Sequence, residues 1–419
     1  MITGKKDMKC GLIGEKLGHS FSPQIHRELA DYSYELFEMS EKEVGSFLKS
    51  GRFDATNVTI PYKKTVMPFL DEISDEAIRI GSVNTVTRLE NGGLRGDNTD
   101  YYGFWYTVEK SGIEIKGKNV LILGTGGASL TARTVSADMG AASITFVSRT
   151  GEINYENVYE RCPDAEVVIN CTPVGMYPKN GISPIDLTRL KNCCGVVDMI
   201  YNPAKTKLLL DAERLGIKCS NGLPMLVAQA KKACELFLGE KINDSEIDRI
   251  STAIANETSN IILVGMPGCG KTTVAGILAS MTGREMVDTD EMIKQSECRS
   301  PSEIIKTDGV DAFRKIEHAQ VGLAGKLSGR IISTGGGVVT RDENYEPLHQ
   351  NGRIFFIHRS LERLADDDRP LSKAGDIRDM YRQRLPMYQR FCDFEVSNDG
   401  TAEQCATEIL TKFRKDEKA

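Results

Sequence analysis

The chain has 419 residues, of which 27% are charged and 40% hydrophobic, and its formal net charge is −6. This length predicts two or three domains, and this composition is typical of a folded protein rather than a disordered one. The acidic balance argues against general binding of nucleic acid, and no apolar run approaches the ~20 residues that cross a bilayer.

The first residues and the cysteines indicate the cellular compartment in which the protein is expected. The first residues include lysines but no apolar segment of the kind found in a signal peptide, so we expect a cytoplasmic protein. The 11 cysteines form no CxxC pair, so we expect reduced thiols and no structural zinc. For His19 and His26 we expect hydrogen-bonded structural roles.

Short apolar runs alternate with amphipathic stretches along almost the whole chain. Such alternation predicts an α/β fold in which helices cover both faces of parallel sheets. The expected strands are 9–13, 54–60, 119–123, 143–147, 167–171, 195–200, 260–264, 330–333 and 353–357, and helices are expected at 129–139 and 272–281, among others. A sustained polar stretch at 239–259 predicts a surface helix followed by a short linker, so we place the main domain boundary there.

Polar residues gather at the ends of the first predicted strands. Two serines, Ser20 and Ser22, stand where a helix opens, Lys63 follows a strand, and Asn84 and Asp100 stand near other strand ends. Polar side chains at several strand ends suggest a pocket at the carboxyl edge of a sheet. Lys63 and Asp100 would suit an acid–base pair, and a surface salt bridge is an equally good interpretation of these two residues alone.

A glycine-rich turn follows the predicted strand 119–123. It reads Gly124-Thr125-Gly126-Gly127-Ala128-Ser129 and leads directly into a helical pattern. Glycines allow a pyrophosphate to approach the backbone, and the helix N-terminus supplies N–H donors and a positive dipole. A purely structural tight turn explains such a motif about as often.

The next predicted strand ends in Ser148-Arg149-Thr150, where a dinucleotide fold contacts the adenosine ribose. An acidic residue there would bind a free 2′-hydroxyl group and indicate NAD. A guanidinium flanked by two hydroxyls suits a 2′-phosphate instead, so we expect NADP. The alternative for Arg149 is a solvated charge at a strand end.

Eight motifs of the first part together resemble shikimate dehydrogenase over about residues 8–250. They are GxSxSP, NVTxPxK, xVNT, GxNTDxxG, GxGGA, TPxGM from Thr172, DxxYxPxxT from Asp198 and GLPMLVxQ from Gly222. The resemblance implies that Lys63 is the acid–base residue, paired with Asp100. It also implies a substrate site formed by Ser20, Ser22, Thr59, Asn84, Asp100, Tyr201 and Gln229, and an NADP cleft lined by Gly124, Gly126, Gly127, Ala128, Ser148, Arg149, Thr150, Met199 and Gly222.

A second glycine-rich loop follows the predicted strand 260–264 and is far more specific. Residues 265–272 match GxxxxGK[ST] between a strand and a helix, and Thr273 follows. Backbone N–H groups of such a loop bind phosphates, the lysine reaches the β- and γ-phosphate oxygens, and the hydroxyl after it ligates Mg²⁺. The expected ATP-binding residues are Gly265, Gly268, Gly270, Lys271, Thr272 and Thr273.

Further motifs follow this loop in a fixed order. They are Asp288-Thr289-Asp290, Phe313-Arg314, Gly335-Gly336-Gly337, Arg369-Pro370-Leu371 and Arg384-Leu385-Pro386-Met387-Tyr388. A carboxylate at a strand end beside a P-loop can hold Mg²⁺, and arginines can anchor an anionic substrate. Together with the P-loop, they resemble shikimate kinase over residues 258–419.

The second resemblance implies roles for these residues. Thr272 and Asp288 would hold Mg²⁺, and Asp288 would be catalytic with Lys271. Shikimate would be bound by Asp290, Arg314, Gly336, Gly337 and Arg384, and Arg369 would close over ATP.

The two resemblances together imply an architecture and a function. The architecture is a two-lobed dehydrogenase with a doubly wound dinucleotide-binding lobe, followed by a P-loop kinase domain with a parallel sheet. We expect a substrate lobe at 1–102 plus 222–250, an NADP-binding lobe at 103–221, a linker at 251–258 and a kinase domain at 259–419. The chain would reduce 3-dehydroshikimate with NADPH and phosphorylate shikimate with MgATP.

Two alternatives stay open. The first is a quinate-oxidising dehydrogenase fused to another small-molecule kinase, against which Arg149 and the Asp290, Arg314 and Arg384 set argue. The second is a ligand-sensing regulator built from inactive enzyme domains, against which the presence of Lys63, Asp100, Lys271 and Asp288 argues. The expected partners are small molecules, with neither nucleic acid nor membrane, and the sequence leaves the oligomeric state open.

Overall fold

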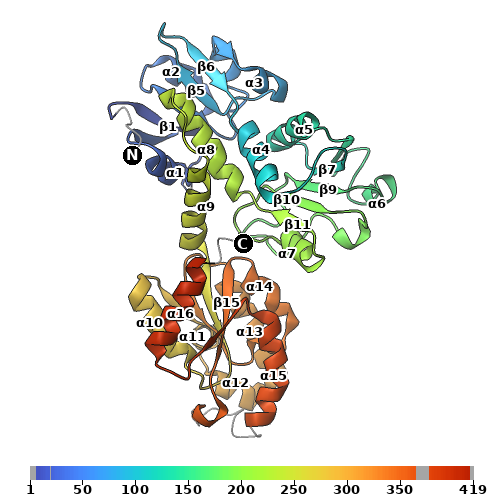
Figure 1. The fold of residues 1–419 in the computed structure, drawn as a ribbon, viewed down its shortest axis with the longest axis vertical. Coiled ribbons are helices and arrows are strands. Elements are labelled where there is room, and N and C mark those ends of the chain that lie inside the picture. Colours follow the sequence, from blue (N-terminus) through green and yellow to red (C-terminus); the bar gives the residue numbers. More distant parts are fainter. Residues whose placement is uncertain (1–5, 19, 365–376, 416–419) are drawn as a thin grey trace. The chain divides into compact units, whose positions relative to one another are not determined.

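The computed structural model describes residues 6–18, 20–364 and 377–415, along which strands and helices alternate (Figure 1). The chain divides into two compact units, each of which is described by itself. The first comprises Met1–Gly175, Ile182–Tyr201 and Asp211–Ser251, and the second comprises Met176–Gly181, Asn202–Leu210 and Thr252–Ala419. In the described ranges, no helix is both long and apolar enough to cross a membrane.

The first unit opens with a six-stranded sheet in the order β2-β1-β3-β5-β6-β4. Strands β1, β2 and β3 are parallel, whereas β5 runs antiparallel to both β3 and β6. This sheet is mixed rather than parallel because five residues join β5 to β6, fewer than a parallel crossover needs. Its strands are β1 Lys9–Gly14, β2 Ser33–Glu38, β3 Ala55–Val58, β4 Glu72–Ile73, β5 Thr85–Arg88 and β6 Leu94–Asp97, and its helices are α1 Ser22–Leu29, α2 Glu41–Lys49 and α3 Asp75–Ile80.

The second sheet of the first unit is parallel, in the order β11-β10-β9-β7-β8. From β7, the chain passes to the edge strand β8 on one side and then to the central strand β9 on the other. This reversal is the doubly wound topology expected from the sequence. The elements are β7 Asn119–Leu123, β8 Ser143–Val147, β9 Val167–Asn170, β10 Gly195–Asp198 and β11 Lys218–Ser220, with helices α4 Asp100–Ser111, α5 Gly127–Asp138, α6 Val158–Arg161 and α8 Leu223–Leu238.

His26, on α1, lies in the core against β2 and α8. Its side chain is 1% exposed, its Nδ1 lies 2.6 Å from the Tyr32 hydroxyl, and its ring stacks on Tyr34 with centroids 4.0 Å apart. Burial lowers the pKa of His26 to about 3 because a charged imidazolium would be poorly solvated there. The expected structural role is confirmed for His26, whereas His19 lies outside the described residues.

The second unit contains a five-stranded parallel sheet in the order β13-β14-β12-β15-β16. The central strand β12 is buried along its whole length, as its apolar run predicts. The strands are β12 Asn260–Val264, β13 Met286–Asp288, β14 Ile331–Ser333, β15 Gly352–His358 and β16 Phe394–Ser397. The helices are α10 Lys271–Thr282, α11 Thr289–Glu297, α12 Pro301–Asp308, α13 Val310–Ala324, α14 Tyr345–His349, α15 Ile377–Phe391 and α16 Ala402–Lys415.

Two helices cross the boundary between the units along the chain. Helix α7 (Lys207–Arg214) crosses it after Leu210, and helix α9 (Ser245–Thr258) crosses it after Ser251. Residues 251–258, which the sequence analysis assigned to a linker, are therefore helical, and Ser259 alone separates α9 from β12. The polar stretch 239–259 also contains apolar residues that lie on one face of α9. Among them, Ile247, Ile250 and Ile254 are at most 2% exposed.

Candidate active sites

The first site is built around an ion pair at an edge of the mixed sheet. Lys63 Nζ lies 2.6 Å from Asp100 Oδ2, and the two side chains are 27% and 15% exposed. Lys63 follows β3, and Asp100 is the first residue of α4, directly after β6. Since β3 and β6 run in the same direction on either side of β5, their carboxyl ends meet at one edge.

Asn84 fixes the carboxylate of this pair. Its Nδ2 donates to Asp100 Oδ1 at 2.9 Å, and its Oδ1 accepts from the Thr99 N–H at 2.7 Å. Asn84 precedes β5, and because β5 is antiparallel its start lies at the same edge as the ends of β3 and β6. Asp100 also stands at the N-terminus of α4, where the helix dipole favours a negative charge.

Other predicted substrate residues lie around the ends of β1 and β10. The Ser22 N–H donates to Ser20 Oγ at 3.2 Å, and neither serine side chain caps α1. Phe21, between them, meets the Tyr201 ring edge-on with centroids 6.0 Å apart, which brings Tyr201 beside this loop. Burial raises the pKa of Tyr201, so its hydroxyl stays protonated.

Thr59 and Gln229 are placed by backbone packing. The Thr59 N–H donates to the Ile13 carbonyl at 2.9 Å, which holds the end of β3 beside the end of β1. Gln229 lies on α8, where a Cβ at Gly103 of α4 would come within 3.0 Å of the Gln229 Cβ. Gly103 therefore allows α4 and α8 to pack closely behind the ion pair.

The second site lies where the parallel sheet of the first unit reverses its strand order. Gly124 follows β7 with φ +100°, and a Cβ there would lie 3.0 Å from Thr172 Cγ2 beyond the end of β9. Gly126 caps α5, and a Cβ at Gly126 or Gly127 would meet nothing within 4 Å. The turn therefore packs against the sheet at Gly124 and leaves free space in front of the helix N-terminus at Gly126 and Gly127. Ala128 follows in the first turn of α5. That geometry fits a dinucleotide pyrophosphate.

The end of the neighbouring strand β8 supplies the predicted ribose contacts, Ser148, Arg149 and Thr150. Arg149 and Thr150 are exposed and Ser148 is half-buried. The Arg149 charge lies near Tyr155, whose pKa burial raises and Arg149 partly lowers again. Arg149 thus presents an accessible guanidinium beside the open turn.

Met199 and Gly222 lie against each other beyond the ends of β10 and β11. The Gly222 N–H donates to the Ile200 carbonyl at 3.0 Å, and a Cβ at Gly222 would collide with the Met199 carbonyl. Gly222 is therefore needed for the close approach of α8 to the end of β10.

The third site is the P-loop of the second unit, between β12 and α10. Gly265, Gly268 and Gly270 have positive φ angles of 152°, 80° and 94°. Lys271 is buried, and its Nζ donates to the Gly265 and Met266 carbonyls at 2.8 and 3.0 Å. The loop thus holds its lysine over the turn in which phosphates bind.

Oxygen ligands for a hard cation stand next to this loop. Thr272 Oγ1 lies 3.3 Å from Asp288 Oδ2 and 3.5 Å from Ser333 Oγ. The other carboxylate oxygen, Asp288 Oδ1, accepts from the Asp290 N–H at 2.9 Å at the start of α11, which orients the carboxylate. Hydroxyl and carboxylate oxygens are the donors that Mg²⁺ prefers, so this set fits the expected metal. Thr273 follows on α10.

An arginine held by a buried carboxylate adjoins the cation ligands. Arg314 Nη1 donates to Glu317 Oε2 at 2.6 Å, and the two side chains are 7% and 1% exposed. A Cβ at Gly337 would collide with the Arg314 guanidinium, and one at Gly335 would lie 2.8 Å from Asp290 Oδ1. Burial raises the pKa of Glu317, Arg314 opposes that rise, and the Asp290 charge adds to it. Asp290 and Arg314 therefore converge over the glycines after β14.

Helix α15 supplies the second arginine. Arg384 Nη1 donates to the Gly336 carbonyl at 3.1 Å, and the Tyr388 hydroxyl donates to the same oxygen at 2.5 Å. Arg384 also acts on the pKa of Glu317, so the two arginines and Asp290 belong to one cluster. Such a cluster suits a small substrate with one carboxylate and several hydroxyls.

Comparison with known proteins gives the two parts separate relatives. Residues 12–86 match the model "Shikimate dehydrogenase substrate binding domain" and residues 267–414 match "Shikimate kinase". Shikimate dehydrogenase (NADP(+)) of Clostridium beijerinckii is 37% identical over 265 residues, which cover 59% of this chain and 98% of the relative. The chain belongs to the shikimate dehydrogenase family. Its second unit carries the shikimate kinase match, so the resemblance of both parts is confirmed.

Solved structures agree with the dehydrogenase assignment. A chorismate mutase/shikimate 5-dehydrogenase fusion protein from Clostridium acetobutylicum is 38% identical, with a TM-score of 0.56 over 59% of this chain and 97% of that one. Shikimate 5-dehydrogenase from Thermus thermophilus, solved with NADP(H) and shikimate, is 29% identical, with a TM-score of 0.53 over 59% and 99%.

Some residues of these sites were missed by sequence reasoning. Glu317 was not predicted, although its spacing of three from Arg314 on a helix was a usable signal. Tyr388 was noticed only as part of a motif, and its contact with Gly336 depends on the tertiary fold. Arg369, the predicted lid residue, lies outside the described residues.

Proposed function

We propose that the first unit reduces 3-dehydroshikimate to shikimate with NADPH, and that the second phosphorylates shikimate to shikimate 3-phosphate with MgATP. The observation that carries the proposal is that one chain holds both a Lys63–Asp100 pair in a dehydrogenase fold and a complete P-loop beside an arginine-rich acceptor cluster. The two reactions share shikimate, as the product of one and the substrate of the other.

In the reductase site, Lys63 is the general acid. NADPH, when bound, supplies the hydride for the ketone carbon. The Lys63 ammonium donates a proton to the oxygen that becomes the hydroxyl, and it regains a proton from solvent. Asp100 holds the amine in place through the 2.6 Å contact, while Asn84 and the α4 N-terminus hold the carboxylate. Ser20, Ser22, Thr59, Tyr201 and Gln229 surround the ring.

The cofactor is bound across the strand-order reversal. The open turn at Gly124, Gly126, Gly127 and Ala128 takes the pyrophosphate, and Ser148, Arg149 and Thr150 take the 2′-phosphate. Met199 and Gly222 line the nicotinamide end of the cleft. The exposed guanidinium of Arg149 supports NADP rather than NAD, and a biosynthetic rather than a quinate-oxidising role.

In the kinase site, catalysis is positioning and neutralisation of charge. ATP, when bound with Mg²⁺, supplies the γ-phosphoryl group. Lys271 leaves the loop carbonyls for phosphate oxygens, while Thr272 and Asp288 hold the cation. Arg314 and Arg384 bind the shikimate carboxylate beside Gly336 and Gly337, and Asp290 binds the ring hydroxyls. Glu317 positions Arg314.

Two assays of the purified chain test this function. NADPH oxidation is followed with 3-dehydroshikimate, and ADP release is followed with shikimate. Quinate with NAD or NADP serves as the comparison for the first assay, and other small hydroxy acids serve for the second. We expect both shikimate-linked activities; oxidation of quinate in preference to shikimate, or ATP consumption independent of shikimate, would contradict the proposal. We also propose a cytoplasmic enzyme with small-molecule partners.

A further inference from the structure

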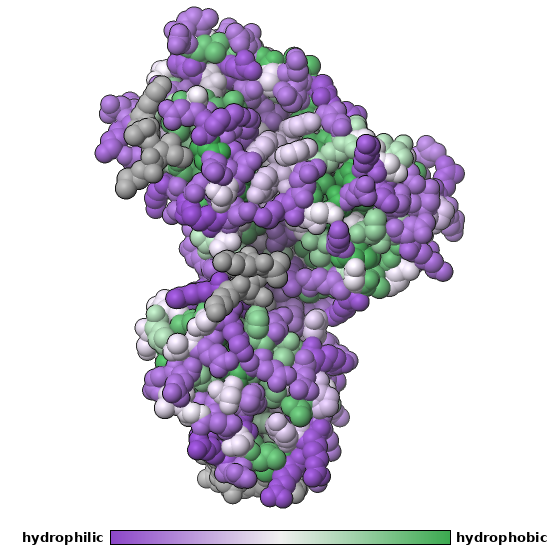
Figure 2. Space-filling model, in the orientation of Figure 1, coloured by the Kyte–Doolittle hydropathy of each residue, from purple (hydrophilic) through white to green (hydrophobic). Residues whose placement is uncertain are grey.

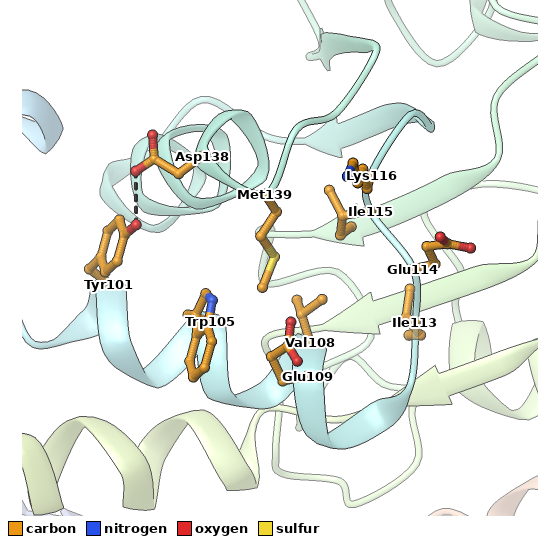
Figure 3. Close-up of a pocket in the computed structure, with 10 residues that line it drawn as sticks. All are labelled: Tyr101, Trp105, Val108, Glu109, Ile113, Glu114, Ile115, Lys116, Asp138 and Met139. Atoms are coloured by element: carbon orange, nitrogen blue, oxygen red, sulfur yellow. Dashed lines mark hydrogen bonds between the residues drawn. The ribbon is translucent and has the colours of Figure 1, made fainter.

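A cavity of about 350 Å³ lies in the first unit, outside the residues assigned to the three sites (Figure 3). Helix α4 forms its floor, the end of α5 faces it, and residues 113–116 close one side. Its apolar wall consists of Trp105, Val108, Ile113, Ile115 and Met139. On the face shown in Figure 2, hydrophobic surface gathers beside α5. The volume suits a small organic ligand rather than a macromolecule.

The polar groups around the cavity are mostly acidic. Glu109, Glu114 and Asp138 contribute carboxylates, and Lys116 contributes the single ammonium group among the lining residues. The chain as a whole also carries a net charge of −6. An anionic ligand would therefore be repelled, while a cationic head group would find carboxylates at the rim. The rings of Tyr101 and Trp105 favour a cation and a flat apolar body as well.

Asp138 connects this cavity to the lobe that holds Lys63. Its Oδ2 accepts from the Tyr101 hydroxyl at 2.8 Å, and its Oδ1 lies 2.5 Å from Arg79 Nη2 on α3. The hydrogen bond from Arg79 lowers the pKa of Asp138, and burial together with Asp138 raises the pKa of Tyr101 to about 12. The carboxylate thus joins α3 of the substrate lobe to α4 and α5 while forming part of the cavity rim.

We propose that this cavity binds a small organic cation with a flat apolar body, of the arylalkylamine class, and that its occupant weakens the Arg79–Asp138 contact. The aryl group lies between Trp105 and Met139, and the ammonium group lies against Asp138 at the Tyr101 end of the cavity. Glu109, further along α4, adds negative potential without direct contact. An ammonium group on Asp138 competes with the Arg79 guanidinium. Since Tyr101 follows Asp100 directly on α4, the occupant affects the site that the proposed function assigns to the reductase.

The chain provides its own probe, because Trp105 is its single tryptophan. Fluorescence of the intact protein, excited at a wavelength that only tryptophan absorbs, is titrated with phenethylamine, 2-phenylethanol and 3-phenylpropanoate. These three share the aryl group and differ in charge, and free N-acetyltryptophanamide corrects for collisional quenching. We expect a saturable change with the amine, a weaker one with the alcohol and none with the carboxylate.

A matched pair of variants localises the effect. Glu109 is exposed, so Glu109→Lys leaves the fold intact and should weaken amine binding about two- to five-fold. Glu160→Lys, an exposed glutamate on α6, should bind as the parent protein does. Absence of a saturable response to the amine, an equal response to all three probes, or parental affinity in Glu109→Lys would overturn the site.

The effect on the lobes has a separate readout and rests on the proposed function. At saturating amine we expect the KM for 3-dehydroshikimate to rise about two- to five-fold in the parent protein and to stay constant in Arg79→Met. An unchanged KM in the parent, with amine binding seen by fluorescence, would overturn the coupling. A chain without reductase activity would overturn the proposed function, and the fluorescence titration would still decide the site.

Discussion

The Nζ of Lys63 and the Oδ2 of Asp100 lie 2.6 Å apart although 37 positions separate them along the chain. The contact depends on β5, which runs antiparallel between β3 and β6 and so brings two carboxyl strand ends and its own start to one edge. Lys63, Asn84 and Asp100 thus meet through sheet topology. Family likeness gives their roles, and the fold gives the reason for their proximity.

Arg149 should determine the choice between NADPH and NADH. Replacement by Ala removes the accessible guanidinium at the end of β8, and a charge-assisted bond to phosphate contributes about 1.5–3 kcal/mol. We expect the KM for NADPH to rise about ten-fold or more while the KM for NADH changes little. Arg133→Ala, an exposed arginine on α5, is the control. Equal effects of Arg149→Ala on both cofactors would show that Arg149 does not contact the 2′-phosphate.

In the kinase site, phosphate binding and acceptor binding should separate. Lys271→Ala should abolish phosphorylation, since its amine serves the phosphates whatever the acceptor is. Asp290→Asn should raise the KM for shikimate about ten-fold or more and leave ATP affinity near the parental value. Calorimetric titration of each variant with ATP and with shikimate distinguishes the two effects. An Asp290→Asn protein with parental shikimate affinity and turnover would remove Asp290 from the acceptor site.

Neutral His26 should make the first unit sensitive to acid. Its folded pKa of about 3 lies below the ordinary value of 6.5, so the unfolded chain binds the extra proton between these two pH values. The contribution of His26 to the free energy of unfolding is therefore complete above pH ~6.5. Below that pH it falls by up to ~1.4 kcal/mol per pH unit. Urea unfolding monitored through Trp105 measures this unit alone, because it contains the chain's single tryptophan.

The matched variant for this effect is His26→Phe, which keeps a ring against Tyr34 and Phe237. We compare the slopes of the free energy of unfolding against pH between pH 6.5 and 4.5, above the range in which most carboxyl groups titrate. In His26→Phe we expect a slope that corresponds to about one proton fewer taken up on unfolding than in the parent chain. Identical slopes in both proteins would mean that His26 is not held neutral.

Much of this fold could be predicted from the sequence, and the reasons differ between elements. The bounds of β7, β8 and β12 were predicted correctly because each is an apolar run ended by a sharp turn or glycine loop. Strand β2 (Ser33–Glu38) was missed because it is an edge strand with no fully buried residue, so its sequence lacks the apolar signal. Strand β5 (Thr85–Arg88) was not among the predicted strands, and its antiparallel pairing could not be predicted because local patterns do not indicate strand direction.

The sites were less predictable than the sheets. Motifs indicated Lys63, Asp100, Thr272 and Asp288, and the structure brings Lys63 to Asp100 and Thr272 to Asp288. Glu317 was missed because an acidic residue on an amphipathic helix is usually solvent-exposed, whereas its side chain is 1% exposed. Its burial becomes visible only when α13 packs beside the glycines after β14.

The course of α9 changes how the two parts should be separated. A cut at Glu257 would divide this helix and remove Ile254, which is 2% exposed, from the second unit. Burial of one isoleucine contributes about 1.5–3 kcal/mol, so we expect a fragment of residues 243–419 to melt roughly 4–8 °C above one of residues 258–419. Equal melting temperatures would show that α9 does not stabilise the second unit. Residues 1–258 should give a soluble reductase.

The measurement that tests the central claim most directly uses one substitution and two substrates. The Lys63→Ala chain is supplied with NADPH and MgATP, and shikimate 3-phosphate is quantified after addition of either 3-dehydroshikimate or shikimate. Lys64→Ala, an exposed lysine beside it, is the control. We predict that Lys63→Ala slows formation from 3-dehydroshikimate by ~10²–10⁴-fold and leaves formation from shikimate unchanged. Near-parental formation from 3-dehydroshikimate, or loss of both reactions together, would contradict two separate sites acting in sequence.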